Sequence, residues 1–312
     1  MSTPKSVSQA RVWWYLVGTF CFWLMSPVSA WAAEDAQAEA RARIAKLETR
    51  VHQLARGVEQ NIVPAAWHQE AKWELERARL EQALAAIEPK LEAQPELHKQ
   101  KITLEVQLAR LDVARAAHSL EMARKLFKKG ALPQMDVQQE EISCERAKIA
   151  LALLEVDEQF SRDAITAAEH ARRSAELQAQ QAGLAAEESR INAARVEAEL
   201  EAGRARPLAL MHAQSELAEA LANHEAAQLE AEIAAGKVPQ AEADAARLRL
   251  RLKHAGEAAA RAEAILAHVQ KAYALGLDTR EEMEDARRRR DNARRNLEVL
   301  KQQGELKTEA PK

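Results

Sequence analysis

The chain has 312 residues and a formal net charge of −3 at pH 7, and seven of its twelve aromatic residues lie within residues 1–32. The apolar residues elsewhere are therefore almost all alanine, leucine, valine and isoleucine, and the whole chain holds only nine glycines and nine prolines. A charged fraction of 30% with abundant alanine, glutamate, arginine and leucine is typical of long helices. This composition argues against a compact enzyme with glycine-bearing active-site loops, and the charge balance argues against a nucleic-acid-binding protein.

The N-terminus predicts a secretory signal peptide over residues 1–32. Lys5 and Arg11 precede an apolar run at 12–25, and two small-x-small cleavage sites follow at 28–30 and 30–32. This order of charge, apolar run and small residues is that of a secretory signal. We therefore expect secretion across the inner membrane and a periplasmic location, close to a membrane without spanning it. The alternative is an uncleaved signal anchor, because a bilayer is spanned by ~20 apolar residues and the stretch 12–32 has about that length.

Cleavage of the predicted signal leaves one cysteine, Cys144. A single cysteine cannot form an intramolecular disulfide. Cys144 falls on an apolar helix face, so we interpret it as a small buried apolar residue. A redox role, or a disulfide between two copies of the chain, is the alternative.

Five short breaks interrupt a helical pattern over residues 33–301. Each begins with glycine or asparagine, which tolerate the left-handed conformation that ends many helices, and four have proline or threonine three residues later, where a new helix starts. The breaks lie at 61–64, 130–133, 203–207, 236–239 and 276–279. Weaker breaks near Gln94 and Thr166 would divide the two longest intervals. The tail 302–312, which contains Gly304 and Pro311, is expected to be disordered.

The residues around each break repeat an apolar pattern at heptad spacing. Three, seven and ten positions before the first break residue, every repeat has an apolar or amphipathic side chain, as at Tyr273, Val269 and Leu266. Ten and seventeen positions after it, four of the five residues are alanine. Such a seam packs two helices side by side, and such a break reverses the chain. The sequence predicts an all-α fold of long antiparallel coiled-coil helical hairpins, elongated and without a β-sheet.

Two segments resemble a known hairpin turn. Residues 123–137 look like the turn in the helical hairpin of periplasmic membrane fusion (adaptor) proteins, and they are equally similar to the helical repeats of TolC-type outer-membrane efflux proteins. Residues 272–286 resemble the same turn. The resemblance covers the helical region only, without the β domains of either family. It implies contacts with an outer-membrane channel, with inner-membrane transporter subunits or with another copy of the chain. The candidate contact residues are Leu126, Gly130, Leu132, Pro133, Tyr273, Gly276 and Thr279.

The sequence carries no motif for catalysis or for cofactor binding. None of the nine histidines is followed by another at three or four residues, so we expect no metal site on a helix face. The arginines at 287–290 follow a run of acidic residues. The pairs Glu284–Arg288 and Asp285–Arg289 predict a solvated, ion-paired helix face there rather than a surface for nucleic acid.

The sequence therefore predicts a periplasmic protein that acts by its shape. In this interpretation it is an accessory or adaptor-like component of an envelope export or efflux assembly, and it contacts partners through hairpin tips and seams. The alternative is a structural spacer or a periplasmic holdase chaperone with no role in transport. Neither function requires an active site, a cofactor or nucleic acid.

Overall fold

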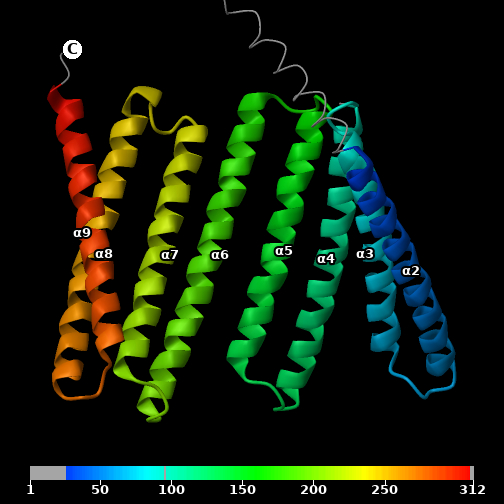
Figure 1. Cartoon of the computed structure of the whole chain (residues 1–312), viewed down its shortest axis with the longest axis horizontal. Coiled ribbons are helices and arrows are strands. Elements are labelled where there is room, and N and C mark those ends of the chain that lie inside the picture. The colour runs from blue at the N-terminus through cyan, green and yellow to red at the C-terminus, as the bar shows by residue number, and fades with distance from the viewer. Residues whose placement is uncertain (1–25, 95, 310–312) are drawn as a thin grey trace, which may run out of the picture. The chain divides into compact units, whose positions relative to one another are not determined.

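The computed structural model describes residues 26–94 and 96–309, and within these ranges its regular structure is eight α-helices and one short 3-10 helix. The elements are α2 (Ser26–Glu59), α3 (Ala65–Ile87), η1 (Glu88–Lys90), α4 (Leu97–Lys128), α5 (Gln134–Ser161), α6 (Ala167–Glu201), α7 (Pro207–Ala234), α8 (Gln240–Ala274) and α9 (Arg280–Glu309) (Figure 1). The predicted all-α fold of helical hairpins is confirmed. In the described part of the chain, no helix has the length and apolar character needed to cross a membrane. The predicted signal peptide lies outside the described residues, except for 26–32 at the start of α2.

The chain divides into two compact units, residues 1–111 and 112–312, with the boundary inside α4. In the first unit, α2 packs against α3. Three ion pairs connect these two helices: Arg43–Glu81, Glu48–Arg79 and Arg50–Glu74. Residue numbers rise along α2 as they fall along α3, so the two helices are antiparallel.

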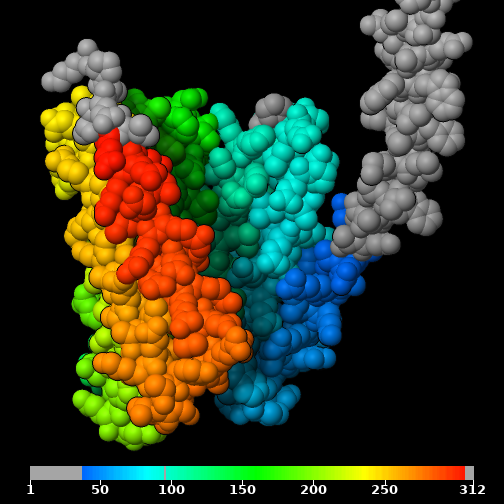
Figure 2. Space-filling view, turned by 60° about the vertical axis from the view of Figure 1, so that its left-hand side comes forward, coloured from blue at the N-terminus to red at the C-terminus, as the bar shows by residue number. Residues whose placement is uncertain are grey.

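In the second unit, each helix from α5 to α9 packs closely against the next in chain order and runs antiparallel to it (Figure 1). Side chains bridge every one of these interfaces: Arg146–Glu188, His224 with the Ala179 carbonyl, Arg247–Glu230 and Arg294–Glu263. The alternation brings the α4–α5, α6–α7 and α8–α9 turns to one end of the unit, called the tip end below. Figure 2 shows the last two of these turns together at that end.

Alanine forms much of the packing between the helices. Four of the eight alanines that the repeat placed in the seam after the breaks are 1–5% exposed, namely Ala71, Ala78, Ala213 and Ala286, and the other four are partly buried. Small side chains at these positions allow close approach of the helix backbones. Phe127 and Tyr273 were predicted in the same seam, but they are 45% and 41% exposed. Both residues lie near a helix end, and their rings remain partly exposed beside their turns.

The turns have the backbone geometry that their glycines and asparagine predict. The first residue of each of the five breaks has a positive φ of 59–72°. At the α4–α5 turn, the amides of Gly130 and Ala131 donate to the carbonyls of Phe127 and Leu126 at 2.8 and 3.0 Å. These bonds satisfy carbonyls that the end of α4 leaves unpaired, and they require a left-handed residue at position 130.

The two longest intervals between breaks, 64–130 and 133–203, each contain two α-helices rather than one long helix. Between α3 and α4, the chain passes through η1, where Pro89 prevents α3 from continuing. Between α5 and α6, Asp163 takes a φ of 58°, and Thr166 caps α6 by accepting a hydrogen bond from the amide of Glu169 at 3.2 Å. Asp163 precedes Thr166 by three residues, which is the spacing of four of the five other breaks.

The C-terminal tail 302–312, which was predicted to be disordered, is helical over most of its length. Helix α9 continues to Glu309, and only 310–312 of the tail lie outside the described residues. One glycine costs a helix about 1 kcal/mol relative to alanine, which neighbouring glutamine, glutamate and lysine residues offset. Gly304 also faces α8, since a Cβ placed there would lie 3.7 Å from Leu248 and 3.9 Å from Leu252.

Candidate functional site

The α4–α5 turn forms a shallow groove with an apolar floor. Leu126 of α4 and Leu132 of the turn line it together with Met122, and Asp136 and Glu140 of α5 border it. Leu126 is 41% and Met122 is 38% exposed. Two predicted contact residues from opposite sides of the turn therefore share one concave surface, which fits an apolar side chain flanked by a cation.

Gly130 and Pro133, the other two predicted residues of this turn, have a different role. Both are exposed, and neither lines the groove. Gly130 supplies the left-handed residue, and Pro133 is the N-cap of α5 with φ −63° and ψ 153°. They shape the turn and thereby set the positions of the groove residues.

The α8–α9 turn is convex, and its apex is apolar. Leu275 and Leu277 flank Gly276 and are 73% and 71% exposed. The sequence analysis placed Tyr273, Gly276 and Thr279 among the contact residues but missed these two leucines. The sequence pattern that could have identified them is a leucine on each side of a turn glycine, at positions where the helix seam requires no apolar residue.

Thr279 closes a capping box at the start of α9. The amide of Glu282 donates to Thr279 Oγ1 at 3.2 Å, and the amide of Thr279 donates to Glu282 Oε2 at 2.7 Å. The backbone and side-chain hydrogen bonds of Thr279 hold the pKa of Glu282 below its ordinary value. The Thr279 hydroxyl is thus engaged in a capping box.

An ion pair joins the α6–α7 turn to the α8–α9 turn. The Arg206 guanidinium donates to Asp278 Oδ1 and, at 3.3 Å, to Glu282 Oε1. The Asp278 side chain is 2% exposed, and its Oδ2 is buried with no hydrogen-bond partner. The partners are 72 residues apart, so no local pattern reveals the pair. The third break is one residue longer than the others, and Arg206 is the residue just before the displaced proline.

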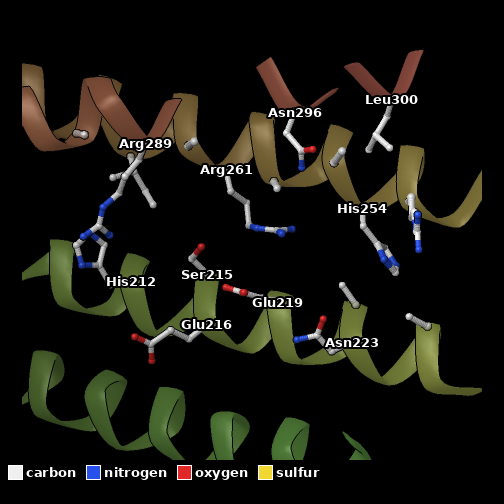
Figure 3. Close-up of a pocket in the computed structure, with 18 residues that line it drawn as sticks. His212, Ser215, Glu216, Glu219, Asn223, His254, Arg261, Arg289, Asn296 and Leu300 are labelled. Atoms are coloured by element: carbon white, nitrogen blue, oxygen red, sulfur yellow. The ribbon is translucent and has the colours of Figure 1, made fainter. Parts of the chain in front are cut away.

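A cleft of about 860 Å³ lies between α7, α8 and α9. Figure 3 shows Arg261 of α8 and Glu219 of α7 extending into it, while Arg289 of α9 points toward His212. The Arg261 Nε is buried with no hydrogen-bond partner. His212 and His254 lie toward opposite ends of the cleft (Figure 3). The described residues of this cleft present separate charges on an alanine-rich floor rather than a nucleophile beside a base.

Packed groups lie near both ends of the cleft. At the tip end lies the apolar cluster of Ile265, Leu266, Val269 and Ala286, against which Leu208, Met211 and Met283 pack. At the other end, Glu225 accepts hydrogen bonds from Lys253 at 2.7 Å and from His254 at 2.9 Å. These two bonds lower the pKa of the Glu225 carboxyl, the Lys253 bond most strongly. The cleft is therefore bounded by structural contacts.

The remaining residues of interest have structural surroundings. Cys144 is buried at 2% exposure within α5, as its seam position predicted. The Asp285–Arg289 pair is present at 2.9 Å. The prediction of a Glu284–Arg288 pair was wrong, because Glu284 instead accepts a hydrogen bond at 2.8 Å from Arg280, which lies on the preceding turn of α9. Within the described ranges, no three histidine, cysteine or acidic side chains are grouped to hold a metal ion.

Comparison with known protein families, curated proteins and solved structures finds no match to this chain.

Proposed function

We propose that this protein is a periplasmic helical-hairpin component of an envelope export or efflux assembly. In this proposal it performs no catalysis and holds other components in place through its hairpin turns. The α4–α5 turn is the principal contact for a protein partner, either an outer-membrane channel or a subunit of an inner-membrane transporter.

The observation that supports the proposal is the groove at the α4–α5 turn. Leu126 and Leu132 line it with Met122, and all three present apolar surface beside acidic residues. Interfaces between proteins commonly place an apolar anchor in such a hollow and surround it with polar contacts. The resemblance of residues 123–137 to the turns of export proteins points to the same element.

Photo-crosslinking in living cells tests this proposal. A photoreactive amino acid replaces Leu132, and adducts are identified by mass spectrometry. The matched control places the same amino acid at Val238, because Val238 follows Gly236 by two residues as Leu132 follows Gly130. Both side chains are partly buried, and the α7–α8 turn lies at the end of the second unit opposite the tip end.

We expect the probe at position 132, and not the probe at 238, to capture a channel or transporter subunit. Adducts of both probes with many unfolded proteins would instead indicate a holdase chaperone. Adducts only between copies of the chain would indicate a spacer that assembles with itself. Either of these two results would refute the export proposal.

A further inference from the structure

Large apolar side chains gather at one end of the second unit. In the described part of this unit, nine such side chains are exposed, and six of them lie within eight residues of a tip-end glycine. The six are Met122, Leu126, Phe127, Tyr273, Leu275 and Leu277. The other three are Phe160, Leu221 and Val299, which lie away from the tip end. Exposed apolar groups in one place mark a surface for a partner.

The exposed charge on the three linking segments at this end is positive. Residues 129–133, 202–206 and 275–279 contain Lys129, Arg204 and Arg206, with Asp278 as their one acid. Asp278 is buried and paired with Arg206, so these two charges balance each other and Lys129 and Arg204 remain. Among the residues directly next to these segments, Lys128 and Arg280 are exposed cations and Glu201 is an exposed acid, so a positive excess remains.

The apolar groups of the α8–α9 hairpin are ordered by depth. Leu275 and Leu277 flank the apex glycine of the α8–α9 turn, whereas Tyr273 lies three residues back, which is about 4.5 Å along a helix. Phe127 lies equally far behind Gly130. Aliphatic side chains at the apex, aromatic rings one turn behind them and lysines beside them form the order found at a bilayer interface. There the rings lie at the level of the headgroups and the lysines reach the phosphates.

We propose that the tip end of the second unit rests on an anionic phospholipid surface, with Leu275 and Leu277 entering the headgroup region. The convex apex suits a deformable lipid surface, while the concave α4–α5 groove remains for a protein partner. The inference rests on the proposed function for its compartment, the bacterial envelope, and it adds the surface against which the hairpins stand. Two leucines and a few cations give weak, reversible binding that added salt reduces.

A local fluorescence probe tests this inference without interference from the rest of the chain. An environment-sensitive fluorophore is attached to L277C in the full-length chain, with Cys21→Ser and Cys144→Ala so that no other thiol reacts. The control carries the fluorophore on L221C, because Leu221 of α7 is 40% exposed but lies away from the tip end. Vesicles of phosphatidylethanolamine with phosphatidylglycerol are compared with vesicles of phosphatidylcholine alone. Circular dichroism verifies that both labelled chains fold.

We expect the fluorophore at position 277 to shift to shorter wavelength with the anionic vesicles only, and the one at 221 to remain unchanged. In the same background, Lys128→Gln with Lys129→Gln should weaken the binding by roughly tenfold or more, since each lysine near an anionic surface contributes about fivefold. Absence of a shift at 277, or an equal shift with phosphatidylcholine, would overturn the inference.

The two proposals fail separately. A silent probe at 277 together with a transporter adduct at 132 would refute lipid contact and leave the export role standing. Vesicle binding at 277 without any channel or transporter adduct at 132 would support lipid contact and refute the export role.

Discussion

Replacing Gly130 by alanine adds one methyl group at the α4–α5 turn, and replacing Gly256 adds the same group within α8. A Cβ at either position has no other atom within 4 Å, so neither change creates a clash. Only the backbone differs, because Gly130 has a φ of +69° and Gly256 lies inside a helix. The pair therefore isolates the conformational term.

The two substitutions should change stability in opposite directions. A left-handed backbone costs an L-residue about 1–2 kcal/mol, so Gly130→Ala should destabilise the folded chain by about 1 kcal/mol. In a helix interior, alanine is favoured over glycine by about 0.5–1 kcal/mol, so Gly256→Ala should stabilise it. The difference between the variants is about 2 kcal/mol, or roughly 30-fold in the unfolding equilibrium at 1.4 kcal/mol per tenfold.

Urea unfolding monitored by far-UV circular dichroism measures both changes. Hydrogen exchange provides a local reading at the amide of Ala131, which donates to the Leu126 carbonyl at 3.0 Å. That amide should exchange faster in Gly130→Ala and remain as protected as in the parent chain in Gly256→Ala. If Gly130→Ala were as stable as the parent, the left-handed turn would be refuted.

Three further predictions concern the second unit. Val269→Ala removes methyl groups from a side chain that is 1% exposed and should lower the free energy of unfolding by about 1.5–3 kcal/mol. Val299→Ala, at a side chain that is 50% exposed, should change the free energy of unfolding by less than about 0.5 kcal/mol. Equal urea midpoints for the two variants would contradict this packing. Arg206→Ala leaves the buried Asp278 carboxylate without a donor and should cost about 1–3 kcal/mol in the same assay, and an unchanged midpoint would show that the pair contributes nothing. Hydrogen bonds from Lys253 and, more weakly, from His254 lower the pKa of Glu225 in the folded chain. The ionised Glu225 therefore stabilises the fold above its ordinary pKa of 4.5, and this stabilisation is lost as the pH falls through the lower folded pKa. Melting temperatures between about pH 5 and pH 3 should therefore fall more steeply for the parent than for Glu225→Gln, and parallel curves would exclude this contribution.

Local sequence signals were sufficient for most of the fold. A glycine or asparagine that ends a helix, with a helix-starting residue three positions later, is a short-range pattern, so the five turns could be located without tertiary information. The turn at Asp163 was placed only loosely, because aspartate adopts a positive φ less often than glycine or asparagine. Its spacing to Thr166 is the signal that would have identified it.

The features that the sequence did not reveal depend on several helices at once. Arg206 meets Asp278 only because α7, α8 and α9 pack together, and the cleft is lined by residues of the same three helices. The seam pattern also treated Tyr273 as an interface residue. Its apolar character fits the heptad, but it lies one residue before the end of α8, so its exposure depends on where the helix ends and not on periodicity.

The pairing of each helix with its neighbour in the chain also affects how the protein folds during synthesis. Close packing joins consecutive helices, as at α5–α6, α6–α7, α7–α8 and α8–α9. Contacts that are so local in sequence give a low contact order, and chains of this kind fold quickly. Each hairpin is able to close as soon as its second arm has been synthesised, while later helices are still unfolded. The Arg206–Asp278 pair, which spans 72 residues, forms only when α7, α8 and α9 have all arrived. It is therefore a natural marker for the end of folding, and its formation reports that the last hairpin has docked.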